Sequence, residues 1–154
     1  TIADYVNANQ SEFEKDIYST GFYRNKAKNI IAAAHMIHAT FDDQIPKTMQ
    51  ELLTVPGVGR KTANVVLQNL YGIHEGFAVD THVFRVAARI GLSTNAKNPL
   101  QTERQLVKYI PEDLIPIAHH WLILHGRYVC LARKPKCHAC GINAYCKYFE
   151  KNVN

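Results

Sequence analysis

The chain has 154 residues, of which 47% are hydrophobic, and a formal net charge of +5. This size and composition fit one compact domain or two small ones with a real core, and the lack of low-complexity stretches argues against disorder. No apolar run approaches membrane-spanning length, and the first residues lack the basic and then apolar pattern of a signal peptide. We therefore expect no membrane partner and an intracellular, reducing location, which in a prokaryote is the cytoplasm or nucleoid.

Helical signals follow one another through the first half of the chain. A capping box at 11–14, Ser-x-x-Glu, predicts the start of a helix, and Gly21 predicts its end. Apolar residues at helical spacing continue over 27–41. A second capping box at 48–51, Thr-x-x-Glu, opens a short helix, and apolar positions over 63–70 mark the face of another.

The same pattern continues in the second half. Asp80 stands where an N-cap belongs, ahead of the apolar positions of 83–88, and Gly91 follows the end of that helix. A third capping box at 102–105, Thr-x-x-Gln, predicts a short helix. Pro111 and Pro116 then break the segment before the apolar run Trp-Leu-Ile-Leu at 121–124.

No stretch alternates apolar and polar residues over the length of a strand. The sequence therefore predicts an all-α protein with short loops. Gly72 ends the helix over 63–70, and a subdomain boundary is expected near Gly72–Gly76. We assign residues 1–74 to a first helical part and residues 75–154 to a second.

The turn Val55-Pro56-Gly57-Val58-Gly59 joins the helices predicted at 48–54 and 60–71. Gly57 and Gly59 allow backbone angles that are closed to other residues and keep side chains off the tip. The freed N–H groups and the N-terminus of the next helix can bind an anion, such as a DNA phosphate, without reading sequence. A plain corner between two helices would also explain the glycines, so the turn alone leaves both interpretations open.

Two polar residues could carry chemistry. Lys61 lies in the first turn after the hairpin, where a lysine can act as a nucleophile that forms Schiff bases or simply bind phosphate. Asp80 follows the apolar segment Phe77-Ala78-Val79. It could be a structural N-cap, or at a cleft its carboxylate could deprotonate an amine or stabilise an oxocarbenium-like transition state. The two roles of Asp80 are compatible.

Four cysteines stand within the last 25 residues, at Cys130, Cys137, Cys140 and Cys146. Four thiolates this close in sequence can hold one iron–sulfur cluster. Structural zinc sites usually combine two short C-x2-4-C knuckles, and only Cys137 and Cys140 fit that form. Disulfides suit short secreted chains. The spacing therefore favours a cluster over zinc, and zinc over disulfides.

The positive charge surrounds these cysteines. Residues 1–126 hold 12 Lys or Arg and 12 Asp or Glu, whereas residues 127–154 hold six Lys or Arg against Glu150 alone. A local basic patch suits a phosphate backbone, although an ordinary solvated tail fits equally well.

Together these stretches resemble the endonuclease III family of DNA glycosylases, in the helix–hairpin–helix superfamily. The resemblance runs from about Glu14 to the C-terminus. The stretches that carry it are Val55-Pro56-Gly57-Val58-Gly59-Arg60-Lys61-Thr62-Ala63-Asn64-Val65-Val66, Ala78-Val79-Asp80-Thr81-His82-Val83-Phe84-Arg85-Val86, His119-His120-Trp121-Leu122-Ile123-Leu124-His125-Gly126-Arg127 and the four cysteines.

The resemblance implies a base-excision-repair enzyme that removes oxidised pyrimidines from double-stranded DNA and nicks the abasic site by β-elimination. It implies a helix–hairpin–helix glycosylase fold, with a partial helical barrel and an iron–sulfur cluster subdomain. Lys61 matches the family's nucleophile and Asp80 its catalytic aspartate, and the four cysteines match the ligands of its 4Fe–4S cluster. The residues expected to contact DNA are Gly57, Val58, Gly59 and Arg60 in the hairpin and Arg133, Lys134 and Lys136 in the loop between the first two cysteines.

Members of the family have further N-terminal residues that supply part of the base pocket. This chain starts inside the barrel, at Thr1 rather than at a Met, so we expect a missing N-terminal segment or a second chain as a partner. Two other functions remain open: a mismatch adenine glycosylase of the same superfamily, whose members carry no lysine at the position of Lys61, and a non-catalytic DNA-binding iron–sulfur fragment.

Overall fold

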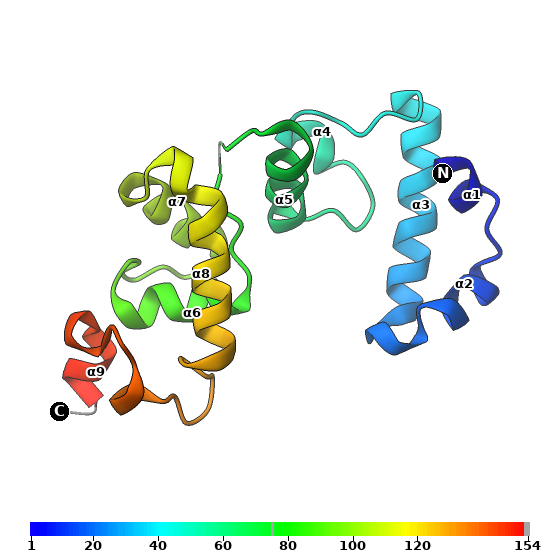
Figure 1. Ribbon diagram of the computed structural model, residues 1–154. Coiled ribbons are helices and arrows are strands. Elements are labelled where there is room, and N and C mark those ends of the chain that lie inside the picture. The colour runs from blue at the N-terminus through cyan, green and yellow to red at the C-terminus, as the bar shows by residue number, and fades with distance from the viewer. Residues whose placement is uncertain (75, 153–154) are drawn as a thin grey trace. The chain divides into compact units, whose positions relative to one another are not determined.

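The computed structural model describes residues 1–74 and 76–152, and every regular element within those ranges is a helix (Figure 1). This confirms the predicted all-α class. The chain divides into two compact units, Thr1–Ala63 and Asn64–Asn154. The division falls inside helix α5 (Arg60–Tyr71), before the boundary expected at 74 and 75. A split within a helix leaves no glycine or proline signal in the sequence, so the separate roles of residues 1–74 and 75–154 stay a prediction.

The first unit is organised around the long helix α3 (Tyr23–Phe41). Helices α1 (Ile2–Val6) and α2 (Gln10–Asp16) both pack against α3, as Figure 1 shows. The short 3-10 turn η1 (Tyr18–Thr20) leads into α3, which buries its small and branched face through Ala27, Ala34 and Ile37. Helix α4 (Met49–Leu52) and the first turn of α5 complete the unit.

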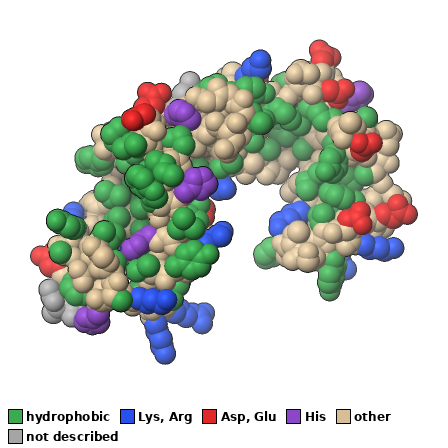
Figure 2. Space-filling view, in the orientation of Figure 1, with side chains coloured by type: hydrophobic (Ala, Val, Ile, Leu, Met, Phe, Trp, Pro, Cys, Tyr) green, Lys and Arg blue, Asp and Glu red, His purple; other side chains and the backbone are tan. Residues whose placement is uncertain are grey.

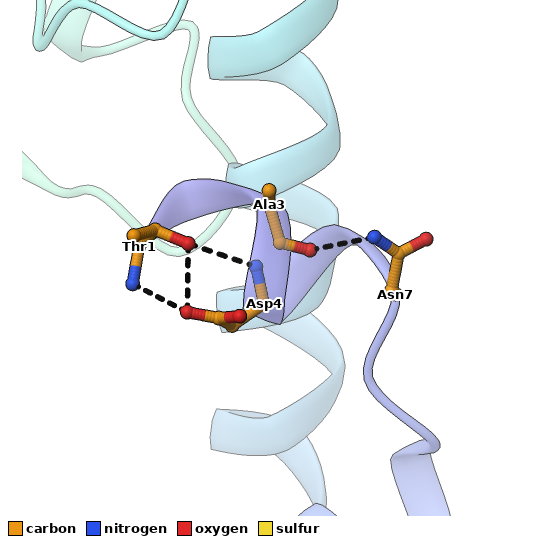
Figure 3. A network of polar contacts seen from close by, with 4 residues as sticks. All are labelled: Thr1, Ala3, Asp4 and Asn7. Atoms are coloured by element: carbon orange, nitrogen blue, oxygen red, sulfur yellow. Dashed lines mark hydrogen bonds and ion pairs between the residues drawn. The ribbon is translucent and has the colours of Figure 1, made fainter.

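The first turn of α1 is capped by its own side chains (Figure 3). The hydroxyl of Thr1 accepts from the backbone N–H of Asp4 and donates to the Asp4 carboxylate, and the terminal ammonium donates to the same carboxylate at 2.7 Å. Asn7 Nδ2 donates to the carbonyl of Ala3 at 2.9 Å. The hydrogen bond from the terminal ammonium lowers the pKa of Asp4, and the Thr1 hydroxyl lowers it further. Because these groups are exposed, the network contributes little to stability.

Two of the three predicted capping boxes are wrong. Helix α2 begins at Gln10, one residue before Ser11, because Asn9 accepts from the N–H groups of Ser11 and Glu12 and so caps it. Helix α7 (Pro99–Tyr109) begins after Asn98, which accepts from Gln101 N at 3.0 Å, and Thr102 is fully buried inside it. An Asn followed by Pro at the first helical position is the stronger start signal.

The second unit contains the rest of α5 and the remaining helices. They are α6 (Thr81–Ile90), α7, the 3-10 turn η2 (Glu112–Leu114), α8 (Ile115–Tyr128), the 3-10 turns η3 (Cys137–Ala139) and η4 (Asn143–Tyr145), and α9 (Lys147–Asn152). Its core lies where α6, α7 and α8 meet, and comprises Phe77, Val79, Val83, Val86, Ala87, Leu106, Ile115, Ala118, Leu122 and Cys130. Gly126 lets α8 approach α6 closely, since a Cβ there would lie 2.9 Å from the Cβ of His82.

The expected break at Pro116 is also wrong. Pro116 lies in the first turn of α8, where its missing N–H has no helical partner to lose, so it starts the helix instead of interrupting it. Gly91 has φ +97 and ends α6, and Gly72 has φ +65 and follows the end of α5, as the sequence predicted. Within the described part of the chain, no helix is long and apolar enough to cross a membrane.

Candidate functional site

The hairpin between α4 and α5 is built as the sequence predicted. Thr48 caps α4, because its hydroxyl accepts from Glu51 N at 3.2 Å and donates to the Glu51 carboxylate at 2.8 Å. Val58 N donates to the carbonyl of Val55 at 3.0 Å, which closes the turn. Helix α5 then begins with the bond from Ala63 N to Gly59 O, at 2.9 Å.

The two glycines of the hairpin, Gly57 and Gly59, play different structural roles. Gly57 has φ +76, and a Cβ at this position would lie 2.8 Å from the Cβ of Asn29 on α3, so both conformation and space exclude a side chain. The φ angle of Gly59 lies outside the left-handed region, and a Cβ there would meet nothing within 4 Å. Gly59 therefore needs no special backbone angle. It leaves the approach to the N-terminus of α5 open.

Lys61 is exposed in the first turn of α5, next to the exposed Arg60, and this turn carries no acidic residue. The partial positive charge of a helix N-terminus and two cationic side chains make this turn attractive to a phosphate. The exposed amine can also reach a ligand bound at the hairpin.

Asp80 is half-buried and caps α6. Its Oδ1 accepts from the backbone N–H of Val83 at 2.8 Å. The preceding Phe77, Ala78 and Val79 are buried, with at most 6% of each exposed. The predicted N-cap is thus confirmed, and the carboxylate is held in a fixed orientation at the edge of an apolar core. Lys61 belongs to the first unit and Asp80 to the second.

The four cysteines line one small cavity. Cys130 follows α8, Cys137 begins η3, Cys140 ends it and Cys146 immediately precedes α9. All four are free thiols, which removes the disulfide interpretation. The other residues around the cavity are Arg89, Ile90, His125, Val129, Pro135, Lys136, Asn143, Tyr148 and Phe149.

The donor set of this cavity fits an iron–sulfur cluster. Four thiols lie around it, with no carboxylate in its lining, and four thiolates can hold one such cluster. Burial raises the pKa of the Cys137 thiol, and Cys130, Cys146 and Cys140 raise it further, while Arg89 acts in the opposite direction.

Two arginines of α6, one turn apart, hold the start of the cysteine segment. Arg85 donates to the carbonyls of Gly126 and Cys130 at 2.8 Å and 3.1 Å. Arg89 donates to the carbonyls of Leu131 and Ala132 at 2.6 Å and 3.0 Å and to Cys130 Sγ at 3.5 Å. The ring of Tyr148 stacks 4.8 Å from the Arg89 guanidinium. Nothing in the sequence analysis identified these residues, because their partners lie more than forty residues away in the chain.

The basic loop follows directly. Arg133, Lys134 and Lys136 are exposed, and Lys134 has φ +50, an unusual angle for a residue with a side chain. Lys136 N donates to the carbonyl of Val129 at 3.0 Å, so the loop is tied back to the end of α8. Figure 2 shows Lys and Arg side chains gathered at the end of this unit where Figure 1 draws the loop.

Three histidines of the second unit make polar contacts. His119 is buried, and its Nδ1 lies 2.8 Å from the carbonyl of Ala78. His82 Nδ1 lies 3.2 Å from Arg85 Nη2. His125 Nε2 lies 3.8 Å from Cys140 Sγ, and burial lowers the pKa of His125.

Comparison with known proteins agrees with this architecture. The sequence model described as the HhH-GPD superfamily base excision DNA repair protein matches residues 1–112, and the iron-sulfur binding domain of endonuclease III matches residues 130–146. The second match contains all four cysteines, and the chain carries a 4Fe–4S cluster.

The relatives are bacterial proteins named endonuclease III. The chain is 46% identical to the one from Rickettsia felis over 153 residues, which cover 99% of this chain and 71% of the relative. It is 51% identical to the one from Synechocystis over 138 residues, or 89% of this chain and 62% of the relative. For the Escherichia coli K12 protein the identity is 45% over 135 residues, or 88% and 63%. The chain thus spans between three fifths and three quarters of the length of these relatives.

Solved structures show the same fold. A trapped endonuclease III–DNA covalent intermediate, described as an estranged-adenine complex, is 40% identical, with a TM-score of 0.91 over 100% of this chain and 72% of the other. A non-covalent endonuclease III–DNA complex is likewise 40% identical, with a TM-score of 0.91 over 99% and 71%. The chain therefore belongs to the endonuclease III family of helix–hairpin–helix base excision DNA repair proteins.

Proposed function

We propose that the protein is a bifunctional DNA glycosylase and abasic-site lyase that acts on oxidised pyrimidines in double-stranded DNA. The observation that carries the proposal is Lys61, an exposed amine in the first turn of α5, directly after a glycine hairpin suited to phosphate. The similarity to an endonuclease III trapped as a covalent intermediate with DNA supports a nucleophile at such a position.

The amine and the carboxylate would divide the chemistry. The Asp80 carboxylate would stabilise the positive charge that develops on the sugar of a nucleotide flipped out of the duplex. The Lys61 nitrogen attacks C1′, the N-glycosidic bond breaks, and the base leaves with a proton.

The C1′–O4′ bond of the sugar then breaks and O4′ takes a proton, which leaves a Schiff base between C1′ and the Lys61 nitrogen. The Schiff base makes the C2′ protons acidic. Loss of one of them breaks the C3′–O bond, which cuts the strand on the 3′ side and releases a 5′-phosphate end. Water then hydrolyses the Schiff base and regenerates the Lys61 amine. Each step needs the sugar held beside Lys61, and the hairpin phosphate contact would supply that hold.

Two segments would bind DNA. The hairpin offers the backbone of Gly57, Val58 and Gly59 and the side chain of Arg60, and the cysteine loop offers Arg133, Lys134 and Lys136. Both segments would contact phosphate groups, so they would position the duplex without reading its bases. A protein that works on chromosomal DNA is active inside the cell, which agrees with the location expected from the sequence.

The four cysteines would hold the 4Fe–4S cluster, and the bound cluster crosslinks the segment from Cys130 to Cys146 without taking part in the base removal. The chain's own groups support this role. Arg85 and Arg89 bind the backbone at the start of the basic loop, and at its end Lys136 N donates to the carbonyl of Val129.

Borohydride trapping tests the proposal. The cluster-loaded protein is incubated with duplex DNA containing either an abasic site or an oxidised pyrimidine, reduced with borohydride and resolved by size. We expect a covalent protein–DNA product and strand nicking from the wild type, and neither from Lys61→Gln, while Lys28→Gln on α3 behaves as the wild type.

Three results would overturn it. Full trapping by Lys61→Gln places the nucleophile elsewhere. Removal of adenine from a mismatch without nicking indicates the adenine glycosylase. DNA binding without any product indicates the non-catalytic fragment.

A further inference from the structure

Asp80 is preceded by a buried segment outside any helix, residues 76–79, which contacts polar side chains from three helices. The described residues of this segment are apolar, with Phe77 and Ala78 fully buried. A segment outside a helix or sheet must find hydrogen-bond partners for its buried backbone groups elsewhere. The partners found here are the side chains of Gln68 on α5 and His119 on α8.

These two side chains bind alternate carbonyls. Gln68 Nε2 donates to the carbonyl of Gly76 at 2.8 Å. His119 Nδ1 lies 2.8 Å from the carbonyl of Ala78, and a carbonyl only accepts, so Nδ1 carries the proton. The ring of His119 also packs edge-on against Phe77, with centroids 6.1 Å apart. Two residues after Ala78 comes Asp80, whose own carboxylate is fixed to Val83 N.

A buried pair of polar side chains packs against the start of the segment. Asn64 on α5 and Glu103 on α7 are both buried and hydrogen-bonded to each other, with Asn64 Nδ2 3.3 Å from Glu103 Oε1. The pair lies directly against Gly76, where an added Cβ would be 2.4 Å from Asn64 Oδ1 and 2.5 Å from Glu103 Oε1. Gly76 is thus in close contact with the Asn64–Glu103 pair, and its carbonyl accepts from the Gln68 amide.

We infer that Gln68 and His119 are positioning residues for Asp80, which fix the backbone of 76–79 and through it the place of the carboxylate. The inference rests on the proposed function, in which the Asp80 carboxylate stabilises the charge that develops on the sugar. Burial of a polar side chain costs free energy unless it is hydrogen-bonded, and the buried His119 and the half-buried Gln68 both make their hydrogen bonds to this segment. Displacement of a catalytic group by about 1 Å can lower a rate by about 10²-fold.

The test is a double-mutant cycle on the cluster-loaded protein. His119→Phe keeps a ring but removes the donor, and His119→Asn restores a donor near the position of Nδ1. The single-turnover nicking rate on abasic DNA is measured for each, for Asp80→Asn, and for the combination of His119→Phe with Asp80→Asn. Affinity for an uncleavable abasic analogue and the melting temperature are measured in parallel.

We expect His119→Phe to slow nicking by about tenfold or more. Affinity for the analogue should stay within about twofold of the wild type, because no phosphate contact is removed. His119→Asn should recover part of the lost rate. On top of Asp80→Asn, His119→Phe should cost nothing further, since residues that act through one group are not additive. The exposed neighbour provides the control, and His120→Phe should nick at the wild-type rate.

Gln68→Leu repeats the cycle from a different helix and at a half-buried position, so the test does not depend on one variant folding. The inference is overturned if both variants nick within about twofold of the wild type, or if their effects multiply with that of Asp80→Asn as independent sites do. Those results leave the proposed function intact. It fails instead if Asp80→Asn or Lys61→Gln themselves retain the wild-type rate.

Discussion

The carboxylate of Asp80 serves structure and proposed chemistry at once. Its Oδ1 accepts from Val83 N and caps α6, while the backbone before it is buried and hydrogen-bonded to Gln68 and His119. A group held this way does not have to be oriented again when DNA binds. The N-cap that the sequence predicted is therefore also a means of placing a charged group with little freedom.

Asp80→Asn separates the two roles. Asn caps a helix about as well as Asp, so the melting temperature should change little. The amide carries no charge and cannot accept a proton, so single-turnover nicking of abasic DNA should fall by about 10²-fold or more. Asp80→Ala serves as the comparison, because it should lose the same activity and also about 1 kcal/mol of cap stability. Unchanged nicking by Asp80→Asn would leave Asp80 a cap alone.

The sequence predicts Lys61 and Asp80 as site residues because each lies in a short contiguous motif. It could not identify the side chains that fix Asp80, since Gln68 lies 8 residues from its partner and His119 lies 41 residues from its own. Local patterns report local geometry. A histidine that binds a distant backbone carbonyl has no signature in the residues around it.

Gly76→Ala tests how tightly this region is packed. The new methyl group would collide with two buried side chains, Asn64 and Glu103, neither of which can move into solvent. Overpacking of this kind typically costs about 1–3 kcal/mol, so the melting temperature should fall clearly. Gly141→Ala is the control, because a Cβ there meets nothing within 4 Å. A wild-type melting curve for Gly76→Ala would mean that the network can yield.

Among the elements, α6 joins the two parts of the proposed site in the second unit. It begins at Asp80, and the same ten-residue helix presents Arg85 and Arg89 to the carbonyls at the start of the cysteine segment. Side chains at i and i+4 share a helix face, which is why both reach the same loop.

The sequence predicted the presence of these helices better than the residues at which they begin. The apolar period of α3, α5 and α6 reflects burial along a whole face, so many residues contribute to the signal. A cap depends on one or two residues. The helices are capped by Asn9 and Asn98, and not by the Ser and Thr that follow them. The capping boxes predicted at 11–14 and 102–105 do not form, because these earlier side chains already accept from the first free N–H groups.

Cys137→Ala tests the cysteine segment as an element. With one proposed ligand gone, the iron content and visible absorbance should drop, and the segment from η3 to α9 should lose protection from hydrogen exchange. The packed positions of α6, α7 and α8 should stay protected, because their core is built from residues such as Val83, Leu106 and Leu122. The exposed neighbour supplies the control, His138→Ala, which should keep its iron. Retention of full iron by Cys137→Ala would remove that cysteine from the ligand set.

At the scale of the whole molecule, the proposed phosphate contacts are of two kinds, backbone N–H groups and charged side chains. The hairpin in the first unit offers N–H groups of a helix N-terminus, whereas the surplus of cationic side chains lies in residues 127–154 of the second. Since residues 1–126 have balanced charge, the C-terminal segment accounts for the entire net charge of +5. The salt dependence of DNA binding should therefore be most sensitive to changes in that segment.

Lys134→Ala and Lys136→Ala test this distribution. Each removes one exposed cation from the basic loop, so each should weaken binding to every DNA sequence alike and reduce the slope of log K against log salt by about one ion. Binding is measured by titration of undamaged, abasic and lesion-containing duplexes at several salt concentrations. Lys108→Ala, an exposed cation in the last turn of α7, is the matched control and should leave the slope unchanged. Uniform weakening would place the loop on the phosphate backbone. Weakening confined to the lesion-containing duplex would place it at the flipped base instead, and an unchanged slope would show that the loop is an ordinary solvated surface.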